Sequence, residues 1–169
     1  MKELVRLLHD LLGDGVVTSY ALFGAVAQMR YTEAVTTLDV DILVVLPEPD
    51  RLDALSGIYA YCASRGYGAE GEAIRVGAWP AQFVPVFSPL TQEAVELAEE
   101  AELEGTLVRV VDAAHLAVIA LSVGRSKDLL RVLSLLQAGS VTREEVASLA
   151  RRHDLADRWT RFEQRFPDE

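Results

Sequence analysis

The segment 38–46 constrains the fold of this chain more than any other, because it is a nearly continuous apolar run that ends at Pro47. A run of this kind is typical of a central strand that other elements cover on both faces. Around it, stretches with leucines at helical spacing alternate with short β-branched stretches, and after residue 112 the pattern is helical throughout. The sequence therefore predicts an α/β (α+β) fold, with a mixed β-sheet core, flanking helices and a helical C-terminal part.

We expect two parts of the chain, an α/β core over 1–112 and a C-terminal helical region over 113–169 that packs on the core. Within the helical region, Thr142 and Glu145 have the spacing of a capping box. The acidic stretch from Glu93 to Glu104 is interpreted as the solvated face of a helix. The expected helices cover about 2–12, 25–30, 51–64, 113–122, 126–138, 142–152 and 154–165, with one more beginning at 89, and the expected strands cover 16–23, 38–46, 70–77, 80–87 and 107–111.

Charge and cysteine content exclude several classes of protein. Acidic residues outnumber basic residues by 26 to 16, and a net charge of −10 repels phosphate backbones, so we expect no duplex DNA partner. The single cysteine, Cys62, excludes a disulfide framework and a four-cysteine zinc site. The N-terminus has no signal-peptide pattern, and the longest apolar run, 116–121, is too short to span a bilayer. We therefore expect a cytoplasmic protein with no membrane association.

The candidate site begins with two carboxylates, Asp39 and Asp41, near the start of the apolar run. Residues i and i+2 of a strand point to the same face, where two ionised carboxylates repel each other. Ligation of a divalent cation explains such a pair, because Mg²⁺ takes one or two carboxylates together with substrate phosphates. Upstream, Gly24 lies at an expected strand-to-helix junction, where backbone N–H groups can approach a phosphate. The alternative is a hydrated strand edge and a plain turn glycine.

These residues resemble the motif of the nucleotidyltransferase superfamily with the DNA polymerase β-like fold. That motif is an apolar residue, Gly, then Gly or Ser, a short spacer, and Asp-apolar-Asp/Glu-apolar. This chain has Phe23-Gly24-Ala25, thirteen residues, and Asp39-Val40-Asp41-Ile42. A second segment, Arg125-Ser126-Lys127-Asp128-Leu129-Leu130, resembles an Arg-x-Lys-Asp element of small bacterial members, including those of toxin–antitoxin and phage-abortive systems.

The resemblance implies a protein that binds a nucleoside triphosphate with Mg²⁺ or Mn²⁺ and transfers a nucleotidyl group to a hydroxyl of RNA, protein or a small molecule. It assigns Asp39 and Asp41 to the metal and to catalysis, and Gly24 and Ala25 to the loop that shapes the phosphate site. Arg125 or Lys127 would contact phosphate. A protein or RNA acceptor, a second copy of the chain or a partner protein are the partners that it implies. An ordinary exposed helix pair is the alternative for Lys127 and Asp128.

The chain departs from the family pattern at two positions. Ala25 stands where the family has Gly or Ser, and alanine tolerates a positive φ poorly. Active members also supply a third carboxylate from a later strand, whereas the matching segment here begins with Gln82 and contains no acid. Glu70 and Glu72, on the preceding strand, are the alternative source. The competing function is therefore a catalytically degenerate member that binds nucleotide or regulates a partner.

Arginines are frequent near the C-terminus, at Arg151, Arg158, Arg161 and Arg165 among others. Helical spacing can bring these four together as a stripe that faces nucleic acid. Acidic residues are interleaved with them, however, and interleaved charge is typical of a soluble helix surface. The sequence leaves both interpretations open.

Overall fold

The computed structural model describes residues 1–33, 37–49 and 53–168, so parts of the expected loop 31–37 and of the expected helix 51–64 lie outside the described residues. The described residues form one seven-stranded mixed sheet with the strand order β3-β4-β5-β2-β1-β7-β6. The strands are β1 (Ser19–Phe23), β2 (Val40–Val45), β3 (Ala69–Glu70), β4 (Ala73–Val76), β5 (Trp79–Pro85), β6 (Glu99–Leu103) and β7 (Thr106–Val110).

Strand β2 is central, as the apolar run predicts. It pairs antiparallel with β1 and parallel with β5, and β1 in turn pairs parallel with β7. Helices cover both of its faces, which accounts for a strand whose residues are almost all apolar. Its fully buried residues are Val40, Ile42, Leu43 and Val44. The predicted α/β (α+β) fold with a mixed sheet is confirmed.

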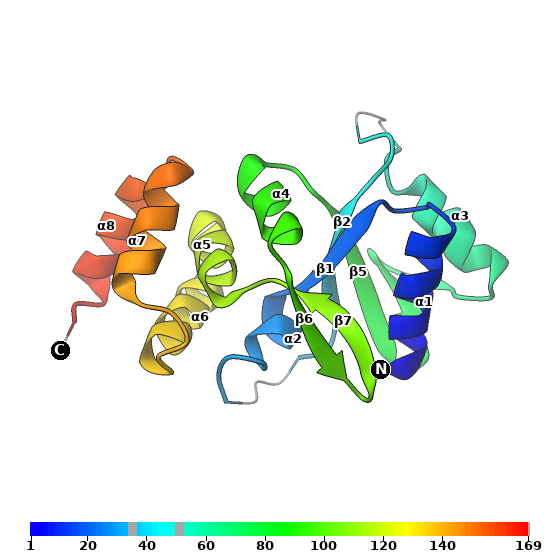
Figure 1. Ribbon diagram of the computed structural model, residues 1–169, viewed down its shortest axis with the longest axis horizontal. Helices are drawn as coiled ribbons and strands as arrows, with labels where there is room; N and C mark the ends of the chain where they lie inside the picture. Colours follow the sequence, from blue (N-terminus) through cyan, green and yellow to red (C-terminus); the bar gives the residue numbers. More distant parts are fainter. Residues whose placement is uncertain (34–36, 50–52, 169) are drawn as a thin grey trace.

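Helices lie on both faces of the sheet and extend beyond it as a separate layer. In Figure 1, α1 and α3 lie on one face, α2 and α4 lie on the other, and α5 to α8 follow beyond α4. The helices are α1 (Lys2–Gly13), α2 (Gly24–Gln28), α3 (Ser56–Ser64), α4 (Pro89–Glu96), α5 (Ala113–Val123), α6 (Ser126–Gln137), α7 (Arg143–Arg152) and α8 (Ala156–Arg165).

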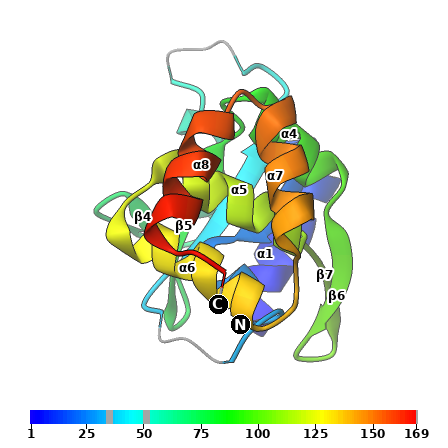
Figure 2. The ribbon, with the colours of Figure 1, turned by 90° about the vertical axis from the view of Figure 1, so that its left-hand side faces the viewer.

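Helix α5 links the sheet layer to the C-terminal helices. It contacts α2 and α4 on one side and α6, α7 and α8 on the other, and Figure 2 shows α7 and α8 in front of it. Seven consecutive residues, 115–121, are buried, so the helix is apolar all round, as a helix surrounded by protein must be. The capping box at the start of α7 is confirmed, because Thr142 accepts from the backbone N–H of Glu145 and the Glu145 carboxylate accepts from that of Thr142.

The interpretation of the acidic stretch as a helix face is wrong over its second half. Helix α4 ends at Glu96, and Glu99–Leu103 forms the edge strand β6, which pairs antiparallel with β7. Glutamates that project from an edge strand hinder its pairing with another chain. The helical spacing of the glutamates in the sequence does not indicate this role. The expected strand 70–77 is likewise two strands, β3 and β4, joined by a turn at Gly71, whose φ is +62°.

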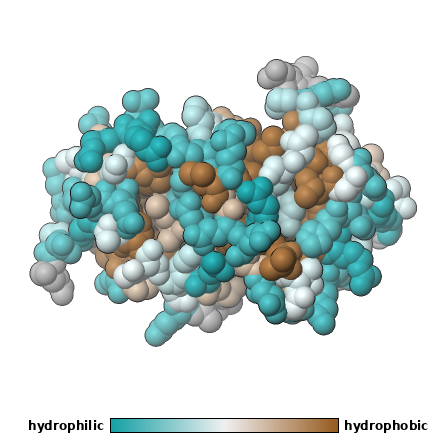
Figure 3. Space-filling view, in the orientation of Figure 1, coloured by the Kyte–Doolittle hydropathy of each residue, from teal (hydrophilic) through white to brown (hydrophobic). Residues whose placement is uncertain are grey.

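The surface is rich in hydrophilic side chains (Figure 3), as expected for a chain with a net charge of −10. Figure 3 shows a mostly hydrophilic face with separate hydrophobic patches between the elements. Among the helices formed by the described residues, none has both the length and the apolar character needed to cross a membrane.

Candidate active site

The candidate site is built where β1 gives way to α2, directly beside the start of β2. Phe23, the last residue of β1, is paired with Asp41, and Gly24 follows with a φ of +66°. A Cβ atom at Gly24 would overlap Oδ2 of Asp41 and lie 2.9 Å from its Cγ. Both the left-handed backbone and this close approach require glycine, so the junction and the carboxylate fit together only with this residue.

Ala25 has no backbone strain from a positive φ, although the family motif has Gly or Ser at this position. The positive φ falls on Gly24, whereas Ala25 is not among the residues with a positive φ and lies in the first turn of α2. No side chain caps this helix, so backbone N–H groups of its first turn lack a side-chain acceptor. A small residue therefore suffices at this position.

Asp39 lies just before β2, and the side chain of Thr37 holds it in place. The Thr37 hydroxyl is 3.2 Å from Oδ1 of Asp39 and 2.9 Å from its backbone carbonyl oxygen. Asp39 and Asp41 are both half-buried, whereas Val40 between them is fully buried. The alternation keeps the two carboxylates out of the hydrophobic core.

The two carboxylates interact with each other and with a basic turn at the start of α6. Burial raises the pKa of Asp41, and the negative charge of Asp39 raises it further. The positive charges of Arg131, Lys127 and Arg125 act in the opposite direction and lower the pKa of Asp41. The structure thus brings the two sequence segments of the resemblance to one place, although 83 residues separate Asp41 and Arg125 in the chain.

Asp128 organises this basic turn. Its side chain is only 2% exposed, and its Oδ2 accepts from Nε of Arg125 at 2.7 Å. Its Oδ1 is 3.8 Å from Nη1 of Arg131. The interpretation of Asp128 as part of an exposed helix pair is therefore wrong, although Lys127 beside it is exposed.

Arg131 is a site residue that the sequence analysis did not identify. Its Nε donates to the side-chain oxygen of Gln28 at 3.0 Å, and Gln28 is buried at the end of α2. The bond ties α6 to the helix that begins at Gly24. Its only sequence signal is the spacing of three from Asp128, which places both residues on one helix face.

Gln82 occupies the position beside Asp41 on the neighbouring strand. The two residues are register partners in the parallel pair of β2 and β5, so both side chains leave the sheet on the same face. Ala81 and Phe83 are buried on the other face, and the register stays continuous to Pro85. The unbroken register, which Pro85 does not shift, therefore keeps the Gln82 side chain on the same face of the sheet as Asp41.

Glu70 and Glu72 do not supply a third carboxylate. Glu70 lies in β3, which is separated from β2 by two strands, and Nε of Arg75 donates to it at 2.7 Å. Glu72 follows in the turn before β4, and its backbone carbonyl accepts from the Tyr59 hydroxyl. Within residues 1–33, 37–49 and 53–168, no three His, Cys, Asp or Glu side chains are grouped so that they could hold a metal ion. The site therefore has two carboxylates and one amide.

Comparison with solved structures places the chain in the class of proteins with the nucleotidyltransferase fold. The crystal structure of ANT(2'')-Ia in complex with adenylyl-2''-tobramycin aligns with a TM-score of 0.54 at 13% identity, over 96% of this chain and 97% of that one. The solution structure of the antibiotic-resistance factor ANT(2'')-Ia gives 0.53 at 14% identity, over 96% and 94%. An antigenic nucleotidyltransferase-like protein from Paracoccidioides brasiliensis gives 0.51 at 13% identity, over 94% and 93%. No protein-family model and no curated protein matches the sequence.

Proposed function

We propose that this protein binds a nucleoside triphosphate together with Mg²⁺ or Mn²⁺ at the junction of β1, β2 and α6. The observation that supports this most directly is the pair of Gly24 and Asp41, a left-handed glycine fitted against a carboxylate and faced by a basic turn. Carboxylates for a cation then lie within electrostatic reach of arginine and lysine side chains for phosphates. This is the arrangement that a metal–triphosphate complex requires.

The residues present fit a hard divalent cation. Asp39 and Asp41 would hold it, and the side-chain carbonyl of Gln82 is a further oxygen ligand on the same face as Asp41. The bound cation would neutralise charge that builds up on the phosphates during transfer. Gly24 and Ala25 would shape the backbone around the phosphates, and Arg125 and Lys127 would contact them.

The proposed reaction is transfer of a nucleotidyl group to a hydroxyl of RNA, protein or a small molecule. ANT(2'')-Ia has been crystallised in complex with adenylyl-2''-tobramycin, so a protein of this fold binds a nucleotidylated small molecule. The second candidate is a degenerate nucleotidyltransferase that binds nucleotide without turnover. Gln82 favours it, because an amide beside Asp41 cannot take a proton from the attacking hydroxyl. A role in a toxin–antitoxin pair follows from the family resemblance alone.

Calorimetry with Mn²⁺ and ATP tests the binding site. Wild type should show heat of binding that Asp41→Asn removes, whereas Asp10→Asn, an exposed residue of α1, should bind like wild type. Equal binding by wild type and Asp41→Asn would reject the carboxylate pair as metal ligands.

The same measurement has a pH dependence with a defined sign. Because the pKa of Asp41 is raised, a proton competes with the cation at a higher pH than at an ordinary aspartate. The affinity for Mn²⁺–ATP should therefore fall as the pH falls through the raised pKa. In the pH range of that raised pKa, binding should also release a proton, seen as a difference in heat between buffers of different ionisation enthalpy.

A further inference from the structure

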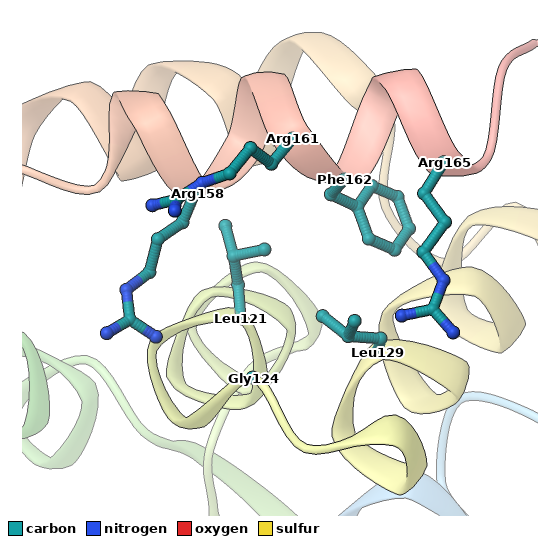
Figure 4. A pocket seen from close by; sticks show the side chains of 7 residues that line it. All are labelled: Leu121, Gly124, Leu129, Arg158, Arg161, Phe162 and Arg165. Atoms are coloured by element: carbon teal, nitrogen blue, oxygen red, sulfur yellow. The ribbon is translucent and has the colours of Figure 1, made fainter.

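A basic pocket lies between α8 and the turn that joins α5 to α6. It has a volume of about 340 Å³. Figure 4 shows Arg158 and Arg165 reaching from α8 toward the helices below, on either side of Phe162 and Leu121. Arg161 is the third arginine of its lining. The arginines recur at i, i+3 and i+7, so one face of α8 presents all three.

The charge of this pocket is not balanced by neighbouring acids. Arg158 donates through Nη1 to the backbone carbonyl of Ser122 at 2.6 Å, and Arg161 donates to a backbone carbonyl of its own helix. Arg165 lies over the ring of Phe166, with 5.3 Å between the guanidinium carbon and the ring centroid. Within residues 1–33, 37–49 and 53–168, none of the three arginines is within 4.0 Å of a carboxylate. Three cationic side chains therefore line one pocket, and among the described residues their partners are backbone carbonyls and a ring.

The floor of the pocket suits an anion held by guanidinium groups. Phe162 and Leu121 are buried beneath the arginines, and Leu129 completes the apolar part of the lining. The three arginines are exposed and can reach a bound anion, and their charge-assisted hydrogen bonds to phosphate are stronger than bonds between neutral groups. Arginine also binds phosphate in a two-point geometry that lysine does not offer. We propose that this pocket binds the phosphate group of a small molecule.

The position of the pocket points to the acceptor of the proposed transfer, and in this respect the inference rests on the proposed function. Gly124 and Leu129, on either side of Arg125 in the chain, line the pocket. Arg125 itself is bonded to Asp128, whose other carboxylate oxygen lies 3.8 Å from Arg131, and Arg131 binds Gln28 of α2, the helix that begins at Gly24. One turn thus borders both places, and a molecule anchored by its phosphate near α8 can extend past Arg125 toward Asp41.

The pocket favours a small phosphate-bearing molecule over RNA. Its volume accommodates one phosphate with an attached sugar, whereas an RNA strand must continue across a surface that carries a net charge of −10. The acidic strand β6 is part of that surface. A single phosphate in a local basic pocket avoids the repulsion that a long polyanion meets.

Calorimetric titration with ribose 5-phosphate tests the pocket, with ribose as the probe that lacks phosphate. Wild type should bind ribose 5-phosphate and not ribose. Arg158→Gln and Arg161→Gln should each weaken binding by about 10- to 100-fold, the effect of one charge-assisted hydrogen bond. Arg151→Gln on α7 makes the same change in net charge at an exposed position and should bind like wild type. Absence of binding by wild type, or an equal loss in Arg151→Gln, would overturn the proposal.

A single-stranded RNA oligonucleotide forms the other arm of the titration. If it binds more tightly than ribose 5-phosphate and depends on the same arginines, the pocket is an RNA site and the small-molecule proposal is wrong. Weaker binding of the oligonucleotide supports the proposal.

Two further measurements separate this inference from the proposed function. The double variant Asp39→Asn with Asp41→Asn should keep its affinity for ribose 5-phosphate, so the pocket is testable even if Mn²⁺–ATP binding fails. In wild type, Mn²⁺–ATP should enhance the ³¹P relaxation of ribose 5-phosphate, and Mg²⁺–ATP should not. The double variant should show no enhancement beyond that of the free ligands. A wild type that binds both ligands without enhancement would overturn the acceptor role.

Discussion

Gly24 is the residue on which the geometry of the candidate site depends most. Its left-handed φ costs any other residue about 1–2 kcal/mol, and a methyl group there meets the carboxylate of Asp41. Gly24→Ala should therefore lower the free energy of unfolding by more than this amount and abolish Mn²⁺–ATP binding. Urea unfolding and calorimetry measure the two effects.

Gly15→Ala provides the matched control for that variant. Gly15 has a similar φ of +70°, but nothing lies within 4 Å of a Cβ atom there. It should show the backbone cost alone and keep nucleotide binding. If Gly24→Ala and Gly15→Ala behaved alike, the contact between Gly24 and Asp41 would have no role in the site.

Substitution of Gln82 distinguishes an active transferase from a degenerate one. If the amide limits turnover, Gln82→Glu should raise the rate of nucleotidyl transfer, since general-base help is typically worth ~10²–10⁴-fold. Labelled ATP, CTP, GTP and UTP with Mn²⁺, and with cell extract as the source of acceptors, provide the measurement. Asp39→Ala is the control for a background reaction. Robust transfer by wild type that Asp39→Ala abolishes would contradict the degenerate alternative.

The residues of the site differ in how far the sequence could predict them. The strand period predicted that Asp39 and Asp41 share one face, and the spacing from Gly24 pointed to the junction beside them, although β2 begins only at Val40. Arg131 was out of reach, because its position depends on a bond to Gln28, 103 residues away in the chain. Local periodicity contains no information about that pairing, which follows from how α6 packs near α2.

At the scale of elements, the buried carboxylate of Asp128 fixes the start of α6. Asp128→Ala would leave the largely buried guanidinium of Arg131 without its acidic partner, and we expect a loss of about 3 kcal/mol in stability. Arg125→Ala removes the other partner, whose side chain is 63% exposed, and should cost less stability than Asp128→Ala. Equal losses in thermal unfolding of the two variants would contradict this asymmetry.

Helix α5 begins with a second polar arrangement, in which Asp112 caps the helix and binds His115. Burial alone would raise the pKa of Asp112, but hydrogen bonds from the side chain and backbone N–H of His115 outweigh it and lower the pKa. The histidine is buried, as expected for a packed side chain, and its other ring nitrogen lies 3.4 Å from Glu93 of α4. The start of α5 thus lies against α4.

This arrangement gives stability a pH dependence. Because the folded pKa of Asp112 is lowered, the stabilisation is complete above the unfolded pKa and is lost as the pH falls through the folded pKa. Asp112→Asn keeps a good cap but removes the charge, so it should be less stable than wild type at neutral pH, by about 1 kcal/mol. The difference should vanish in acid. A difference in urea midpoint that does not change with pH would contradict the assignment.

Most elements were predictable because their signals are local. Apolar residues at helical spacing marked α1, and the continuous apolar run marked β2. Strand β6 was not, because the glutamates at Glu99, Glu100 and Glu102 reflect protection of a sheet edge and not the burial of a face. Pairing with β7, which makes this segment a strand, runs through a two-residue turn at Glu104 and Gly105, and the glycine of that turn is the sequence signal that could have indicated the hairpin.

At the scale of the whole molecule, α5 belongs to the sheet layer and to the C-terminal helices at once. Its buried residues are part of one hydrophobic cluster that includes Leu43 of β2, Val146 of α7 and Phe162 of α8. An element shared in this way couples the two parts of the chain, because neither 1–112 nor 113–169 can expose it without losing core contacts. We expect the molecule to unfold as one cooperative unit.

The two tryptophans of the chain report on this coupling from opposite ends. Trp79 lies in β5 of the sheet, and Trp159 is buried in α8. Trp159→Phe leaves a reporter in the sheet, and Trp79→Phe leaves one in the C-terminal helices. In urea, the fluorescence transition of each variant should coincide with its own far-UV circular dichroism transition. Because the two transitions are compared within one variant, an effect of the substitution on stability does not influence the result. If Trp159 instead reported a transition at lower urea than circular dichroism, the C-terminal helices would unfold first, and 113–169 would be a separate domain on an independently stable core.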